Sequence, residues 1–138
     1  MRRASLLLGA LMALCTARVH AEDVVIIVNK ANLNAVDIEF VRRVYTGALK
    51  GWPDGTPVLA FDQSEDTESR EQFSATVLRK STANLKAIWS QNIFTGKAMP
   101  PRLASPDMEM KRVVAGDRHA IGYVRRSQLD DSVRVIER

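Results

Sequence analysis

The chain has 138 residues, with 20 Lys and Arg against 16 Asp and Glu, and one cysteine. This length suits a single compact domain with one core. A single cysteine excludes an intramolecular disulfide framework.

The N-terminus has the form of a secretory signal peptide. Met1-Arg2-Arg3 precedes an apolar run from Leu6 to Leu14, and Val19-His20-Ala21 follows as a small-x-small cleavage site. The apolar run is far shorter than the roughly 20 residues that span a bilayer. We therefore expect residues 1–21 to be a signal peptide and residues 22–138 to form one exported, periplasmic domain.

Removal of this leader changes the charge of the chain. The leader contains three arginines, no acidic residue and Cys15, so the exported part has 20 − 3 = 17 basic and 16 acidic residues. A net charge of +1 gives no electrostatic footprint for nucleic acid, which we exclude as a partner. Without the cysteine, the exported part also has no thiol nucleophile or thiolate metal site.

The first elements of the exported part are a strand and a helix. Residues 23–29 are β-branched almost throughout, which predicts a central strand covered on both faces, as in a parallel sheet. Asp37 is placed to cap a helix that carries Ile38, Val41 and Tyr45 on one face. Gly47 is a suitable stop for this helix.

The remaining elements alternate in the same way. The pattern predicts, in order, a strand at 57–61, a helix at 67–79, a helix at 81–94, a helix opening at 105–107, and strands at 120–124 and 132–136. This order predicts an α/β fold in three layers, with a mixed, mostly parallel sheet and helices on both faces. Ligands of such sheets bind at the carboxyl ends of strands. Residues 29–32 and the turn after Phe61 both follow strands, which would let them face one crevice.

The turn at residues 62–70 is the main candidate for a site. Thr67, Ser69 and Arg70 lie where a strand leads into a helix, and the free N–H groups and positive dipole of a helix start suit an anion. The same residues also fit plain helix capping, with Arg70 paired to a neighbouring acid. The nearby carboxylates of Asp66 and Glu68 favour a helix start with no ligand at all.

Two aromatic residues have no assigned role. Trp52 lies in a polar loop beside Pro53, where an exposed side chain with a contact role is nearly as well supported as a packed one. Tyr123 follows Gly122 in a strand, and we favour a structural role over a place in the crevice.

Read in this order, the chain resembles the phosphate-type periplasmic substrate-binding proteins, and more closely their short stand-alone relatives. The stretches that carry the resemblance are Val28-Asn29-Lys30-Ala31-Asn32, Val41 to Gly47 with Trp52-Pro53-Asp54-Gly55, the turn at 62–73, Ile88-Trp89 through Phe94-Thr95-Gly96-Lys97, and Ala120 to Val124. Together they cover nearly all of the exported part.

The resemblance implies one lobe of a type II periplasmic binding protein, related to ABC transporters and not an enzyme. It also implies that hydroxyls and amides of the turn hold phosphate, with Ser64, Thr67, Ser69 and Arg70 as the ligand-binding residues. Full-length members have glycines where this chain has Asp66 and Glu68. Those side chains obstruct a close approach of backbone to an oxyanion, and their carboxylates repel it.

Two functions remain open from the sequence. The first is an exported binder of phosphate or another small oxyanion, completed by a second copy of itself or by a membrane transporter or receptor. The second is a periplasmic interaction or sensory adaptor that uses the same lobe without a ligand. We expect no cofactor and no metal, since His119 is the only histidine after the leader. No catalytic triad or glycine-rich phosphate loop is present either.

Overall fold

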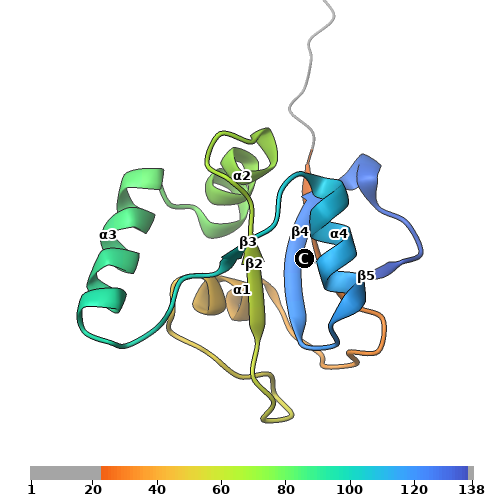
Figure 1. Ribbon diagram of the computed structural model, residues 1–138, viewed down its shortest axis with the longest axis horizontal. Coiled ribbons are helices and arrows are strands. Elements are labelled where there is room, and N and C mark those ends of the chain that lie inside the picture. Colours follow the sequence, from red (N-terminus) through yellow and green to blue (C-terminus); the bar gives the residue numbers. More distant parts are fainter. Residues whose placement is uncertain (1–22, 137–138) are drawn as a thin grey trace, which may run out of the picture.

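The computed structural model describes residues 23–136 (Figure 1). The expected signal peptide, residues 1–21, lies outside the described residues. The domain is an α/β arrangement built on a five-stranded sheet with strand order β3-β2-β4-β1-β5. The predicted class, with helices on both faces of a mixed sheet, is confirmed.

Strand β1 (Val24–Asn29) is buried at every position, as the continuous β-branched run predicted. Its neighbours are β4 (Ala120–Arg125) and β5 (Val133–Ile136), and it pairs antiparallel with both. The parallel setting inferred for this strand is therefore wrong. Burial on both faces selects apolar residues whatever the strand direction, so composition carried no information on it.

The parallel part of the sheet lies on the other side of β4. Strand β2 (Leu59–Asp62) runs parallel to β4 and to β3 (Arg102–Leu103). Within residues 23–136 the sheet thus has two parallel and two antiparallel pairings, a smaller parallel share than expected. Strand β3 has only two residues, both exposed, and no apolar sequence pattern predicted it.

The strand directions decide which loops meet. Because β1 is antiparallel to β4 while β2 is parallel to it, the carboxyl ends of β1 and β2 lie at opposite edges of the sheet. Residues 29–32 and the turn after β2 therefore do not share a crevice, and that expectation is wrong. Figure 1 shows the two edges, with α2 at the top and the loop before β2 at the bottom.

Helices cover both faces of the sheet. On one face lie α1 (Ile38–Tyr45), α2 (Glu68–Gln72) and its π-helical continuation η1 (Phe73–Leu78), with α3 (Thr82–Phe94) beside them. On the other face lies α4 (Asp107–Gly116). A short 3₁₀ turn, η2 (Arg126–Gln128), joins β4 to β5.

Three buried aromatic rings connect the first layer of helices to the sheet. Phe73 stacks on Tyr123 with ring centroids 3.9 Å apart, and Tyr45 meets the edge of Phe73 at 4.8 Å. The Tyr45 hydroxyl donates to the carbonyl of Phe61 at 2.6 Å. Trp52 is also buried, stacked on Phe40 at 5.1 Å, which settles its role as packing.

The start of α1 matches the sequence. Asp37 caps it by accepting a hydrogen bond from the backbone of Phe40 at 2.9 Å. Gly47 follows the helix with a φ of +79°, a left-handed conformation that glycine adopts without strain.

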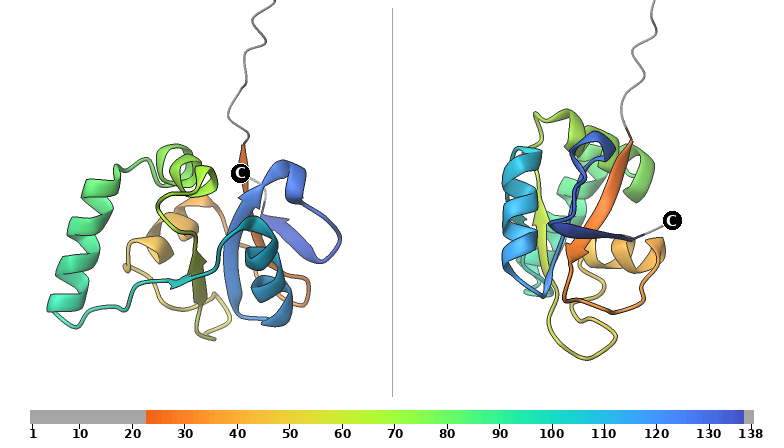
Figure 2. Two further views of the ribbon diagram at one scale, coloured as in Figure 1. Left: turned by 45° about the horizontal axis from the view of Figure 1, so that its top comes forward. Right: turned by 90° about the vertical axis from the view of Figure 1, so that its right-hand side faces the viewer.

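Helix α3 is the least embedded element. Figures 1 and 2 show it at the margin of the molecule, apart from the sheet. Of its residues only Leu85 and Asn92 are buried, and Trp89 is half-buried with its indole donating to the carbonyl of Tyr45 at 3.1 Å. Phe94 at its end and Met99 in the following loop are 89% and 82% exposed.

Candidate functional site

The turn between β2 and α2 lies at the edge of the sheet where β2 ends and the parallel strand β4 also ends. Helix α2 is capped by Thr67, whose hydroxyl accepts from the backbone N–H of Arg70 at 3.2 Å and donates to the carbonyl of Ser64 at 2.8 Å. Capping of the helix is thus the observed role of the Thr67 side chain.

Asp62, the last residue of β2, is the first of two enclosed carboxylates at this edge. Its Oδ1 accepts from the hydroxyl of Tyr123, from the backbone N–H of Gln63 at 2.8 Å, and lies 3.2 Å from Nε of Arg70. Arg70 also donates to the hydroxyl of Ser74. The Arg70 guanidinium, which we predicted to bind an anion, therefore already lies beside the Asp62 carboxylate.

Asp107, the first residue of α4, is the second enclosed carboxylate. Its Oδ1 accepts from the side chain of Gln63 at 2.7 Å and from the hydroxyl of Ser69 at 2.8 Å. Its Oδ2 accepts from Nε of Arg125 at 2.7 Å. Ser69 is buried and directed at this carboxylate, so its hydroxyl belongs to the link between α2 and α4.

The two carboxylates differ in their acidity. Burial raises the pKa of Asp62, and the opposing effects of Arg70 and the Tyr123 hydroxyl do not fully offset it. Burial also acts to raise the pKa of Asp107, but hydrogen bonds from Arg125, Gln63 and Ser69 outweigh it and lower the pKa. Burial and the charge of Asp62 raise the pKa of the Tyr123 hydroxyl, which stays a donor.

A cavity of about 340 Å³ opens between the turn and helix α3. From the turn, Ser64 and Arg70 line it together with Asp62 and Glu65. From the α3 side it is lined by Leu85, Lys86, Trp89, Pro100, Pro101 and Leu103. Thr67 and Ser69 do not line it, so the four residues predicted for ligand binding divide into two pairs.

Charges in this cavity are balanced. Arg70 faces Asp62, and Lys86 lies 3.3 Å from Glu65 in a pair that is more than half exposed. The Ser64 hydroxyl forms no hydrogen bond with any described residue, while its backbone N–H donates to the hydroxyl of Ser105 at 2.7 Å. An entering anion would meet one free hydroxyl and two cations that already have partners.

Sequence reasoning missed Lys86, Asp107 and the contacts of Asp62 with Tyr123. Lys86 reads as an ordinary solvated helix position, and Asp107 as an ordinary acid of a first helical turn. These residues reach the site only because α3, α4 and β4 pack around the turn in the folded chain.

Among residues 23–136, no cluster of three or more acidic, histidine or cysteine side chains is placed to hold a metal ion. His119 lies in the turn before β4, with its backbone N–H donating to Asp117 at 2.8 Å. Within the same residues no helix has the length and apolar character to cross a bilayer.

Solved structures of phosphate-type binding proteins share this fold. A protein described as a phosphate ABC transporter substrate-binding protein, with bound phosphate, from Clostridium perfringens superposes with a TM-score of 0.68 at 19% identity, over 84% of this chain and 44% of that one. An ABC-type phosphate transport receptor from Vibrio cholerae gives 0.66 at 18%, over 84% and 46%. PstS from Borrelia burgdorferi gives 0.61 at 9%, over 83% and 46%.

No family model and no curated protein matches the sequence. The chain spans less than half the length of the three solved structures, and at these identities the likeness establishes the fold. The resemblance inferred from the sequence is confirmed at that level: the chain has the fold of a single lobe of a phosphate-type substrate-binding protein.

Proposed function

We propose that this chain is an exported, non-enzymatic solute-binding module that holds phosphate or a similar small oxyanion at the turn of residues 62–70. The observation that carries the proposal is the hydroxyl of Ser64, which has no partner in the described part of the chain and lines a cavity together with Arg70 and Lys86. Hydroxyl groups and cations at the start of a helix are the usual donors for an oxyanion. A further support is the bound phosphate described for the Clostridium perfringens protein of the same fold.

In this proposal the cavity binds weakly until a second surface closes it. The chain corresponds to under half of each solved neighbour, and a ligand on one lobe stays partly solvated, where charge-assisted hydrogen bonds are weaker. A second copy of the chain, or a membrane transporter or receptor, would complete the cleft. The exposed Leu103, at 70%, lies at the cavity and offers apolar area for such a contact.

Calorimetry with phosphate, sulfate and small carboxylates tests the proposal. Ser64→Ala is the sharpest variant, because the Ser64 hydroxyl has no partner among residues 23–136 and its loss should leave stability unchanged. We expect about a tenfold loss of phosphate affinity, since a hydrogen bond to a charged ligand is removed. Lys86→Gln, at an exposed position, should weaken binding to a similar extent.

Ser90→Ala, an exposed serine of α3 outside the cavity, is the matched control. Absence of heat with phosphate at about 10 mM, or an equal effect of Ser64→Ala and Ser90→Ala, would refute the proposal. Arg70→Ala is a poor test, because it strips Asp62 of its counter-charge and destabilises the fold.

The second candidate is a ligand-free interaction or sensory adaptor. It is favoured by the use of Thr67 and Ser69 inside the fold and by the balanced charges of the cavity. Under this function phosphate gives no heat, while sedimentation velocity detects self-association or a complex with a membrane partner that Leu103→Ser weakens. Binding of phosphate by the monomer with loss in Ser64→Ala would instead favour the first function.

A further inference from the structure

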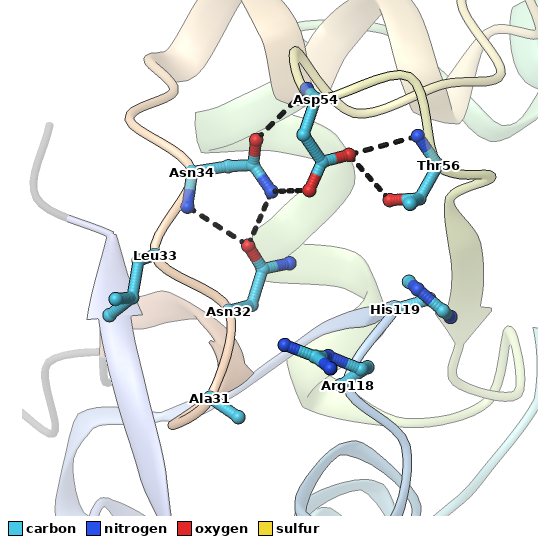
Figure 3. Close-up of a pocket in the computed structure, with 8 residues that line it drawn as sticks. All are labelled: Ala31, Asn32, Leu33, Asn34, Asp54, Thr56, Arg118 and His119. Atoms are coloured by element: carbon cyan, nitrogen blue, oxygen red, sulfur yellow. Dashed lines mark hydrogen bonds between the residues drawn. The ribbon is translucent and has the colours of Figure 1, made fainter.

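A second cavity lies at the opposite edge of the sheet from the turn of residues 62–70. It has a volume of about 500 Å³ and is formed by the loop after β1, the loop before β2 and the turn before β4. Figure 3 shows the eight side chains that line it: Ala31, Asn32, Leu33, Asn34, Asp54, Thr56, Arg118 and His119.

Asn32 is the informative residue of this cavity. It is 5% exposed, and its Oδ1 accepts from the backbone N–H of Asn34 at 3.0 Å and from the Asn34 side chain at 2.8 Å. The backbone donor fixes which end of the amide is oxygen. The other end of the amide is consequently the Nδ2 donor, which is buried without any hydrogen-bond partner in the described part of the chain.

The position of this amide suggests a missing acceptor. Figure 3 shows the Asn32 nitrogen directed into the space between Asp54 and Thr56 on one side and Arg118 and His119 on the other. A buried donor left without an acceptor is destabilising, and such groups in native proteins usually have a partner. The backbone of Asn32 is held in place, since its carbonyl accepts from Nε and Nη2 of Arg134 at 3.1 and 2.7 Å.

The remaining polar groups of the cavity show which partner fits. The carboxylate of Asp54 accepts from the backbone N–H and hydroxyl of Thr56 at 2.9 and 2.6 Å, and from the side chain of Asn34 at 3.0 Å. Arg118 is exposed and forms no hydrogen bond or ion pair with the residues that the structure describes. The Asp54 carboxylate already accepts three hydrogen bonds, whereas Asn32 Nδ2 and the Arg118 guanidinium are donors without a partner among the described residues.

We propose that this cavity binds a small monocarboxylate, with its oxygens accepting from Asn32 Nδ2 and the Arg118 guanidinium. A guanidinium pairs well with a planar carboxylate, and Ala31 and Leu33 offer apolar contact to a short carbon chain. Asp54 disfavours a ligand of higher negative charge such as phosphate, because like charges at short range repel. The volume lies within the roughly 300–1,000 Å³ typical of small-molecule sites.

This proposal stands apart from the proposed phosphate function, since the two cavities share no residue. The test uses ¹H–¹⁵N spectra of the labelled protein titrated with propionate, lactate and phosphate. With propionate and lactate, the side-chain NH₂ pair of Asn32 should shift and saturate, together with backbone signals of residues 31–34, 54–56 and 118–119. With phosphate, those signals should move little, whereas residues 62–70 report on the other cavity.

Arg118→Gln should weaken propionate binding about tenfold, as expected for the loss of a charge-assisted hydrogen bond. Arg126→Gln, an exposed arginine at the opposite edge of the sheet, is the matched control and should bind as the wild type does. An Asn32 NH₂ pair that does not move with about 10 mM of either carboxylate would overturn the proposal. Equal affinities of the two arginine variants, or larger shifts with phosphate than with propionate, would also overturn it.

Discussion

The two edges of the sheet use their polar groups in opposite ways. At the edge of residues 62–70, Gln63, Ser69 and Arg125 all donate to one carboxylate, that of Asp107. At the other edge, Asn32 carries a buried donor with no partner and Arg118 remains unpaired in the described residues. The hydroxyl-rich turn, to which the resemblance assigned the ligand, is mostly closed, whereas the loops at the other edge hold donors without a partner among the described residues.

This difference shows that residue types suited to a ligand are equally suited to holding secondary structure together. The hydroxyls of Thr67 and Ser69 form hydrogen bonds within the fold, because α2 and α4 approach the turn from two sides. Asn32 Nδ2 has no partner among the described residues, because its loop lies at the opposite edge of the sheet from that convergence. The two edges therefore differ in how many of their polar side-chain groups have hydrogen-bond partners. Substitution of these side chains at each edge measures this difference.

The largest effect should come from Asp107→Ala at the closed edge. We expect a loss of about 2–3 kcal/mol in the free energy of unfolding, because Gln63 and Ser69 lose a buried acceptor. Arg125 contributes less, since its side chain is 37% exposed and regains water. Urea denaturation measures the loss, with the exposed Asp131→Ala as control; equal effects in the two variants would contradict a closed network.

Asn32→Ala at the open edge should have a smaller effect, about 1 kcal/mol. The variant removes the acceptor of the Asn34 backbone N–H, but it also removes the unpaired Nδ2. The same urea experiment measures it. A loss as large as that of Asp107→Ala would mean that Asn32 Nδ2 has a partner in solution, and the contrast between the edges would fail.

Asp62→Asn should change how stability depends on pH. The folded-state pKa of Asp62 is raised, so its contribution is fully present below the unfolded pKa of about 3.9 and is lost as pH rises through the folded value. Relative to the variant, the wild type should lose stability as pH rises above about 4. Asp66→Asn supplies the same change of net charge; an identical pH profile would assign the effect to net charge alone.

Asp107 should act in the opposite direction, because its pKa is lowered. Its contribution is present above the unfolded pKa of about 3.9 and is lost as pH falls through the folded value. We expect the stability advantage of the wild type over Asp107→Asn to shrink as the pH falls from about 5 to about 2. Urea denaturation of both proteins across this range measures it. A wild-type advantage that grows as pH falls would contradict it.

The smallest effect is a change of acidity at the open edge. Hydrogen bonds from Thr56, first that of its hydroxyl, lower the pKa of Asp54 to about 2. Thr56→Val removes the hydroxyl donor and keeps the backbone donor, so the pKa should rise toward 3.8 with little change in stability. A carboxyl-carbon NMR titration measures it; an unchanged pKa would show that the hydroxyl bond is not formed in solution.

Much of the fold could be predicted from apolar periodicity and from helix cap and stop residues. The Asp37 cap, the Gly47 stop and the buried strand at 24–29 appear as expected. The helix expected at 67–79 instead continues from α2 into the π-helical η1, which no side-chain pattern distinguishes from an α-helix. Strand β3 was missed because two exposed residues become a strand only by pairing with β2.

The amino-acid sequence by itself determined the α/β class, the position of the strand-to-helix turn and the residue types that occupy it. Burial and period are local properties, so apolar patterns record them directly. The tertiary structure decided strand direction, which set residues 29–32 and 62–70 at opposite edges. It also decided which polar groups are paired: Ser69 donates to Asp107 and Arg70 lies beside Asp62, while Asn32 and Ser64 each keep a donor without a partner among the described residues. Hydrogen-bond partners distant in the chain are set by how elements meet, and no local pattern contains that information.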